Sequence, residues 1–174
     1  MTLIVVDVES DGPVPPIYSL VCFGAVVVEP GLDRTFYGET RPISDAWNPD
    51  ALAVSGFTRD QHLGFDDPEM VFRDFVRWVE KVSGGKRATF ISDNVAYDWQ
   101  WVNYYCHRYI GRNPFGFSGR RIGDLYAGLH RDARKPWKHL RRTVHDHNPV
   151  NDAKGNAEVL LDLSGEIRGL IRNA

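Results

Sequence analysis

Residues Thr2–Glu9 read TLIVVDVE, and this stretch decides the fold. A nearly unbroken run of β-branched and aliphatic residues is typical of a central strand that is buried on both faces. Asp7 and Glu9 stand two positions apart near its end, so their side chains lie on the same face of the strand. The stretch therefore predicts a buried strand that carries two adjacent carboxylates.

The segments that follow predict a mixed sheet flanked by helices. Two further strands, Ser19–Glu29 and Thr35–Arg41, are separated only by the turn 30–33, which indicates an antiparallel meander. The other expected elements are short helical pieces at Pro49–Val54 and Thr58–His62, a helix from Pro68 to Gly84 with Asp67 as N-cap, a strand at Ala88–Ser92, a helix at Tyr97–Ile110, a short strand within Arg120–Leu125, a helix over Asp124–Leu129, and a last helix from Pro149 to Leu170 with Ile167 facing inward. This order is typical of an α/β domain.

Length and composition indicate a single globular domain over residues 1–174. Hydrophobic residues make up 43% of the chain and charged residues 25%, which are ordinary globular values. The apolar runs are too short to span a bilayer, and no signal peptide is visible. The two cysteines, Cys22 and Cys106, form no CxxC motif, which fits a reducing cytoplasm.

The net charge of −2 hides a basic region between Arg108 and Arg142, which holds ten Lys or Arg against Asp124 and Asp132. One basic region on a nearly neutral protein suits an anionic polymer that is contacted on one side. An ordinary solvated charged surface is the alternative.

Three motifs carry the expected chemistry, and the first is the pair Asp7 and Glu9. Two unpaired anions on one face of an apolar strand would repel each other and lose hydration, and a divalent cation removes this conflict. Carboxylate oxygens suit Mg²⁺ or Mn²⁺. The alternative is that Asp7 merely ends the strand at the surface.

The second motif, Asn94 to Asp98, opens a helix directly after a strand, where ligand sites of α/β proteins form. Helix capping by Asp93 or Asn94 is the simpler reading of the same residues.

The third motif is His147 to Asp152. Pro149 fits the first turn of the last helix, which puts His147 just before that helix and Asp152 about one turn inside it. His145 is the alternative histidine. Together, the four carboxylates and one histidine describe a two-metal site that hydrolyses phosphodiesters, with the histidine as general base.

The order of these motifs resembles the DEDDh 3′–5′ exonuclease superfamily, and the similarity extends over roughly residues 3–163. The loop Pro49–Phe57 also resembles the family loop that packs on the 3′-terminal nucleotide. The resemblance implies a ribonuclease H-like fold, with a mixed five-stranded sheet flanked by helices on both sides. It also implies hydrolysis from the 3′ end of single-stranded nucleic acid, DNA or RNA.

The resemblance assigns roles to individual residues. Asp7, Glu9 and Asp152 would hold one Mg²⁺ or Mn²⁺, and Asp7 would bridge to a second ion that Asp98 supports. His147 would deprotonate the attacking water. The candidate substrate-binding residues are Ser10, Ala51, Ser55 and Asn94.

Three positions depart from the family pattern. Ser10 stands where Thr is common, Ser55 replaces a frequent His, and Asp11 is an extra anion without an assigned role. Two other functions stay open: a non-catalytic nucleic-acid-binding module on the same fold, and a phosphodiesterase for short oligonucleotides. A homodimer is a further expectation, because dimers are common among stand-alone members of the family.

Overall fold

A computed structural model describes the backbone of residues 2–172 and the side chains of residues 2–165. Its five-stranded sheet has the order β3-β2-β1-β4-β5. The strands are β1 (Leu3–Ser10), β2 (Leu20–Val27), β3 (Thr35–Glu39), β4 (Thr89–Ser92) and β5 (Gly119–Arg121). β1, β2 and β3 form the expected antiparallel meander, and β4 and β5 extend the sheet in parallel with β1. The mixed sheet and its flanking helices confirm the predicted fold class.

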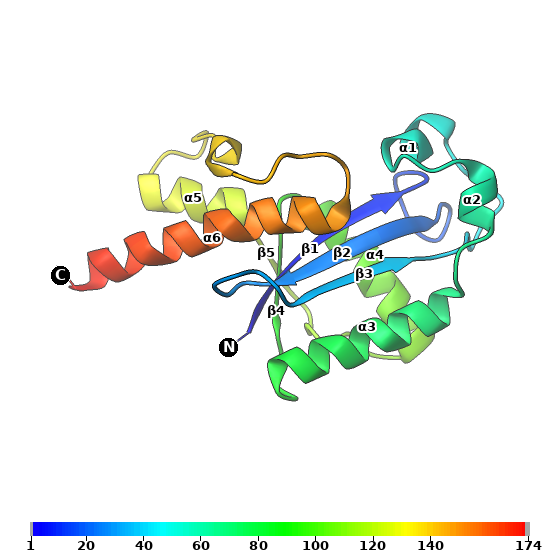
Figure 1. Ribbon diagram of the computed structural model, residues 1–174, viewed down its shortest axis with the longest axis horizontal. Coiled ribbons are helices and arrows are strands. Elements are labelled where there is room, and N and C mark those ends of the chain that lie inside the picture. The colour runs from blue at the N-terminus through cyan, green and yellow to red at the C-terminus, as the bar shows by residue number, and fades with distance from the viewer. Residues whose placement is uncertain (1, 173–174) are drawn as a thin grey trace.

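The helices cover both faces of the sheet (Figure 1). Before β4 the chain forms α1 (Pro49–Val54), α2 (Arg59–Leu63) and α3 (Pro68–Ser83), and after it α4 (Val95–Tyr105), α5 (Ile122–His130), the 3₁₀ turn η2 (Lys138–Leu140) and α6 (Pro149–Arg172). No helix in the described part of the chain is long and apolar enough to cross a bilayer.

The alternation of β1 divides the core into two layers. Ile4, Val6 and Val8 point into one layer, where they pack with side chains of α3 and α4. Val5 points into the other, which α5 and α6 cover. Asp7 and Glu9 have the parity of Val5, so their carboxylates face the side of the sheet on which α6 lies.

Most predicted boundaries agree with the structure to within two residues, and Asp67 caps α3 as expected. The predicted helix Tyr97–Ile110 differs, because it consists of α4 followed by one π-helical turn at Cys106–Ile110, which ends at Gly111 with φ of 77°. The strand expected within Arg120–Leu125 is only Gly119–Arg121, since α5 already begins at Ile122. The side chain of Ile167 lies outside the described residues.

Candidate active site

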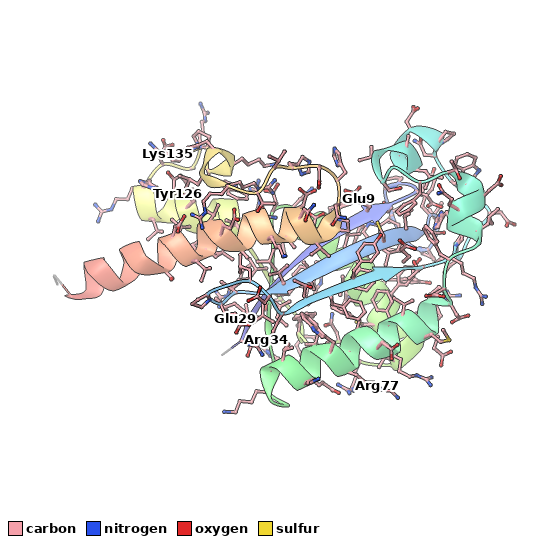
Figure 2. The ribbon with its side chains drawn as sticks, in the orientation of Figure 1. Glu9, Glu29, Arg34, Arg77, Tyr126 and Lys135 are labelled. Atoms are coloured by element: carbon pink, nitrogen blue, oxygen red, sulfur yellow. The ribbon has the colours of Figure 1, made fainter. Side chains whose placement is uncertain are left out.

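Three acidic residues meet where β1 passes the first turn of α6. Oxygen atoms of Asp7, Glu9 and Asp152 all lie within 4.8 Å of one another. In Figure 2, Glu9 points toward the start of α6 from the end of β1. Residues that are about 145 positions apart in the sequence thus form one cluster of carboxylates.

Gly24 on β2 permits this approach of α6 to the sheet. It pairs with Asp7 in the β1–β2 register. A Cβ atom at Gly24 would lie 2.4 Å from the backbone carbon of Pro149 and 2.5 Å from the nitrogen of Val150. Only glycine therefore lets the first turn of α6 pack against the sheet beside Asp7, and the fully buried Ala153 and Ala157 continue the close contact.

Asp98 reaches the same region from the first turn of α4. Its side chain is 4% exposed, and it lies outside the tight group of three acids. Its charge is nevertheless the strongest electrostatic influence that raises the pKa of Asp7. Asn94 occupies the N-cap position of α4, but its side chain makes no capping hydrogen bond. The simple capping reading therefore does not account for the Asn94 side chain.

Both candidate histidines border the acids. His147 Nδ1 lies 3.5 Å from Glu9 Oε1, whereas His145 Nδ1 lies 2.6 Å from Asp152 Oδ1. The two rings are half exposed, with their centroids 4.4 Å apart. His147 adopts a positive φ of 61°, a strained backbone conformation for a residue other than glycine. This turn directs the His147 ring back toward β1.

The acids carry raised pKa values because they are buried close together. Burial raises the pKa of Asp7 well above its ordinary value, and the charges of Asp98, Asp152 and Glu9 raise it further. Burial, followed by the charge of Asp152, raises the pKa of Glu9 to about 7. Burial likewise raises the pKa of Asp98 to about 7. The cluster therefore resists full ionisation without a cation.

The donor set of this cluster fits a divalent metal ion. Both carboxylate oxygens of Asp152 are buried; His145 Nδ1 lies 2.6 Å from Oδ1, whereas Oδ2 makes no hydrogen bond. Buried polar oxygens are normally satisfied, so Oδ2 is free to accept a cation. All the acidic donors are hard oxygen atoms, which Mg²⁺ and Mn²⁺ prefer.

Arg141 is a mostly covered cation near the acids, which the sequence placed only in the general basic region Arg108–Arg142. Its side chain is 9% exposed, stacks over Trp137 at 5.3 Å, and hydrogen-bonds to Asn156 one turn beyond Asp152. Its charge lowers the pKa of Asp7, against the effect of burial. No sequence signal distinguishes Arg141 from the other basic residues of its segment, because its partners come from distant elements.

The candidate substrate-binding residues lie in different environments. Ser10 is 2% exposed, and its hydroxyl donates to Gly12 O and shares a hydrogen bond with the Tyr97 hydroxyl. Its side chain thus faces the interior. Ala51 and Ser55 are partly buried at α1, which contacts β1. The Ser55 hydroxyl donates to Leu52 O, 2.6 Å away.

Asp11 is the centre of a buried network that attaches α1 and α2 to the end of β1. Its fully buried carboxylate accepts from Arg59 Nη1 at 2.9 Å and from the Ser19 amide at 2.5 Å. Its backbone oxygen accepts from the amide of Asn48, the N-cap of α1. The neighbouring His62 is neutral, because burial lowers its pKa to about 4. Asp11 therefore has a structural role that its sequence context did not reveal.

We expect Asp11→Asn to lower the free energy of unfolding by about 3 kcal/mol, because breaking a buried ion pair leaves Arg59 without a compensating charge. Urea denaturation measures the loss. Asp45→Asn is the matched control, since Asp45 is exposed and lies in the loop before α1. Equal stabilities of the two variants would contradict a structural role for the Asp11–Arg59 pair.

Comparison with known proteins agrees with this geometry. The 3′–5′ DNA exonuclease Cap18 of Escherichia coli is 32% identical over 182 residues, which cover 96% of this chain and 95% of Cap18. No protein-family model matches the chain.

Solved structures share the fold at low sequence identity. The nuclease domain of 3′hExo, a DEDDh family member bound to rAMP, has a TM-score of 0.74 at 17% identity, over 95% of this chain and 92% of that domain. Exonuclease I of E. coli, in complex with a dT13 oligonucleotide, has a TM-score of 0.72 at 14% identity. The match covers 99% of this chain and 43% of the Exonuclease I chain. With a full-length relative at 32% identity and this fold, the chain belongs to the DEDDh superfamily of 3′–5′ exonucleases.

Proposed function

We propose that the protein removes nucleotides from the 3′ end of single-stranded nucleic acid, with two Mg²⁺ or Mn²⁺ ions bound at the acidic cluster. The observation that carries this proposal is the group of Asp7, Glu9 and Asp152, whose oxygens converge within 4.8 Å while the buried Oδ2 of Asp152 lacks a hydrogen bond. A binding module without activity would have no need for buried, mutually repelling carboxylates.

Each group in the site has a part in the proposed reaction. Asp7, Glu9 and Asp152 would hold one ion, and Asp98 would support the second next to Asp7. The ions would supply Lewis acidity and neutralise charge on the entering and leaving oxygens. His147 would accept the proton of the attacking water, because a half-exposed imidazole beside Glu9 can take a proton and release it to solvent. α1, which the Asp11 network holds against β1, would pack on the terminal nucleotide.

The substrate is proposed to be a polymer with a free 3′ end. Cap18 is named as a DNA exonuclease, Exonuclease I binds a DNA oligonucleotide in its solved structure, and 3′hExo binds rAMP. Cap18 and Exonuclease I favour a polymer over a small nucleotide, and the rAMP bound to 3′hExo keeps RNA open beside DNA. The basic residues between Arg108 and Arg142 agree with a polyanion.

The direct test uses DNA and RNA oligonucleotides of several lengths with the label at the 5′ end, incubated with Mg²⁺ or Mn²⁺. We expect a ladder of products that shorten one nucleotide at a time, and none in EDTA. Products only from dinucleotides would favour the phosphodiesterase alternative. Binding without cleavage in either metal would favour the non-catalytic module.

Crowding of the acids predicts how metal changes the stability of the protein. The pKa values of Glu9 and Asp98 are raised to about 7, so the folded metal-free protein binds more protons than the unfolded chain near neutral pH. Its stability should therefore fall as the pH rises from the ordinary carboxyl pKa of about 4 to the raised value of about 7, and only the end of this fall lies between about pH 6.5 and 8.5. His62 has the opposite effect, because its lowered pKa makes the folded protein more stable as the pH rises from about 4 to about 6.5. Above pH 6.5 this gain is almost complete, so His62 hardly changes the stability there.

Melting curves in EDTA and in millimolar Mg²⁺ at these two pH values measure the effect. Metal should stabilise the protein by about 2.7 kcal/mol where its concentration is 100-fold above Kd, and the gain should be smaller at the lower pH, where protons compete for the carboxylates. Asp7→Asn should raise the stability of the metal-free protein and reduce the response to Mg²⁺. If Mg²⁺ and Mn²⁺ leave the wild-type curve unchanged at both pH values, the cluster does not bind metal.

A further inference from the structure

A hollow of about 530 Å³ lies between α5 and the segment that leads to η2. Four cationic side chains line it, together with Trp137, His139 and the single carboxylate of Asp124. The four cations are Arg121, Arg134, Lys135 and Lys138. Figure 2 shows Lys135 on the side of the molecule that α5 and α6 form, whereas Arg77 on α3 lies on the opposite side. The hollow is thus a concentrated positive region on the same side of the sheet as the acids.

Two of these cations lack an anionic partner. Arg121 pairs with Asp124 at 3.2 Å, and Lys138 pairs with Asp93 at 2.6 Å. Arg134 and Lys135 are exposed, and neither forms an ion pair with any residue that the structure describes. Their charges are therefore available to a ligand.

Asp93 links the hollow to the strand and helix that lead to the acidic cluster. Arg121 Nε donates to Asp93 O, and Lys138 Nζ contacts the Asp93 carboxylate. Asp93 follows β4 and precedes α4, which carries Asp98. From the hollow, the segment after η2 runs beside α6 to the start of that helix (Figure 1). This segment carries His147, and Asp152 lies in the first turn of α6. A strand with its end at the acids could follow this segment to the hollow.

Four other basic residues of the region Arg108–Arg142 do not join this surface. Arg112 pairs with Glu80 of α3, and Arg108 stacks on Tyr104 and Tyr109, so both lie at the opposite layer of the molecule. Arg141 is buried, and Arg142 pairs with Asp162 at 2.7 Å. The basic stretch of the sequence is therefore not one continuous track, and the hollow gathers four of its cations.

We propose that this hollow binds backbone phosphates of the substrate strand, several nucleotides upstream of the 3′ end that occupies the acidic cluster. The ligand is the sugar–phosphate backbone of single-stranded nucleic acid, because exposed cations around an open hollow recognise charge without reading bases. This inference rests on the proposed function for the position of the 3′ end.

The test measures binding of a labelled single strand of about 12 nucleotides at several salt concentrations, in EDTA so that no cleavage occurs. For Arg134→Ala with Lys135→Ala we expect weaker binding and a slope of log K against log salt that is smaller by about 1.4, since each lost phosphate contact removes about 0.7. Arg134→Lys with Lys135→Arg keeps both charges and should keep the wild-type slope.

Lys81→Ala with Lys86→Ala is the matched control for loss of two charges. Both lysines are exposed, form no ion pair with the described residues, and lie at the end of α3 on the other side of the sheet. This control should leave the salt slope unchanged. Cleavage of a dinucleotide should be the same in all these variants, because a dinucleotide is too short to reach the hollow.

The outcomes separate this proposal from the proposed function. An unchanged slope in Arg134→Ala with Lys135→Ala, alongside normal cleavage, would overturn the hollow as a binding site and leave the exonuclease assignment intact. A slope that falls equally in the Lys81 and Lys86 control would also overturn it, since the effect would then follow net charge alone. Reduced slope in a protein that cleaves nothing would support the hollow and contradict the proposed function.

Discussion

Asp7→Ala is expected to reduce hydrolysis in saturating Mg²⁺ by roughly 10³-fold or more. Asp7 lies at the centre of the acidic cluster, where its oxygens face those of Glu9 and Asp152 within 4.8 Å. Removing one preorganised electrostatic contact costs roughly 10²–10³-fold in kcat, and loss of a group that holds the metal should cost more. The measurement is single-turnover cleavage of an end-labelled oligonucleotide.

Two further variants test whether unfolding, rather than loss of the carboxylate, explains the lost activity. Asp7→Asn should be equally inactive, yet it should melt higher than the wild type in EDTA, because it removes one of several repelling anions. Loss of activity in a more stable protein cannot come from unfolding. Asp74→Asn, an exposed position on α3, should keep full activity. Substantial activity of Asp7→Ala with metal present would contradict the assignment of the site.

His147→Ala is expected to lose about 10²–10⁴-fold in kcat, the usual contribution of a general base. Its Nδ1 lies beside Glu9, and the positive φ of its backbone directs the ring toward the acids on β1. The variant should also lose the acidic limb of the pH–rate profile, which a purely structural role would leave in place. Its KM should change little, because the ring would act on water rather than on the nucleotide.

His145→Ala is the matched control, since the two rings are neighbours and are similarly exposed. We expect this variant to keep the acidic limb and most of its activity. Because His145 also contacts an acid of the cluster, Asp152, the two variants test which of the two histidines is the general base. If His145→Ala shows the large loss and His147→Ala the small one, His145 is the base and the proposed role of His147 is wrong.

The sequence alone determined most of the architecture, because the deciding signals are local. Alternation and β-branched runs predicted the meander, and Asp67 followed by Pro68 predicted the start of α3. The spacing of Asp7 and Glu9 determined that both carboxylates share one face, since side chains on a strand repeat every two residues. The motif around Pro149 likewise placed Asp152 one turn inside the last helix.

Other properties depended on contacts between distant segments. Gly24 carries no signal of its own, yet the absence of its Cβ allows α6 to bring Asp152 against Asp7. Asp11 appeared to be a surplus anion beside the site, and only the fold shows that it is buried against Arg59. The basic stretch is divided between two sides of the sheet, because Arg112 pairs with Glu80 of α3 whereas Arg134 lines the hollow beside α5.

The physical reason for this division is the range of the forces involved. Strand and helix preferences arise from neighbouring residues, so a pattern of a few positions reveals them. Burial, close approach and charge pairing arise only when the chain has folded, and they depend on which residues happen to meet across the sheet. The sequence therefore predicted which side chains carry the chemistry, whereas the tertiary structure decided how close they lie, how strongly burial shifts their pKa values, and which of the basic residues can reach a substrate.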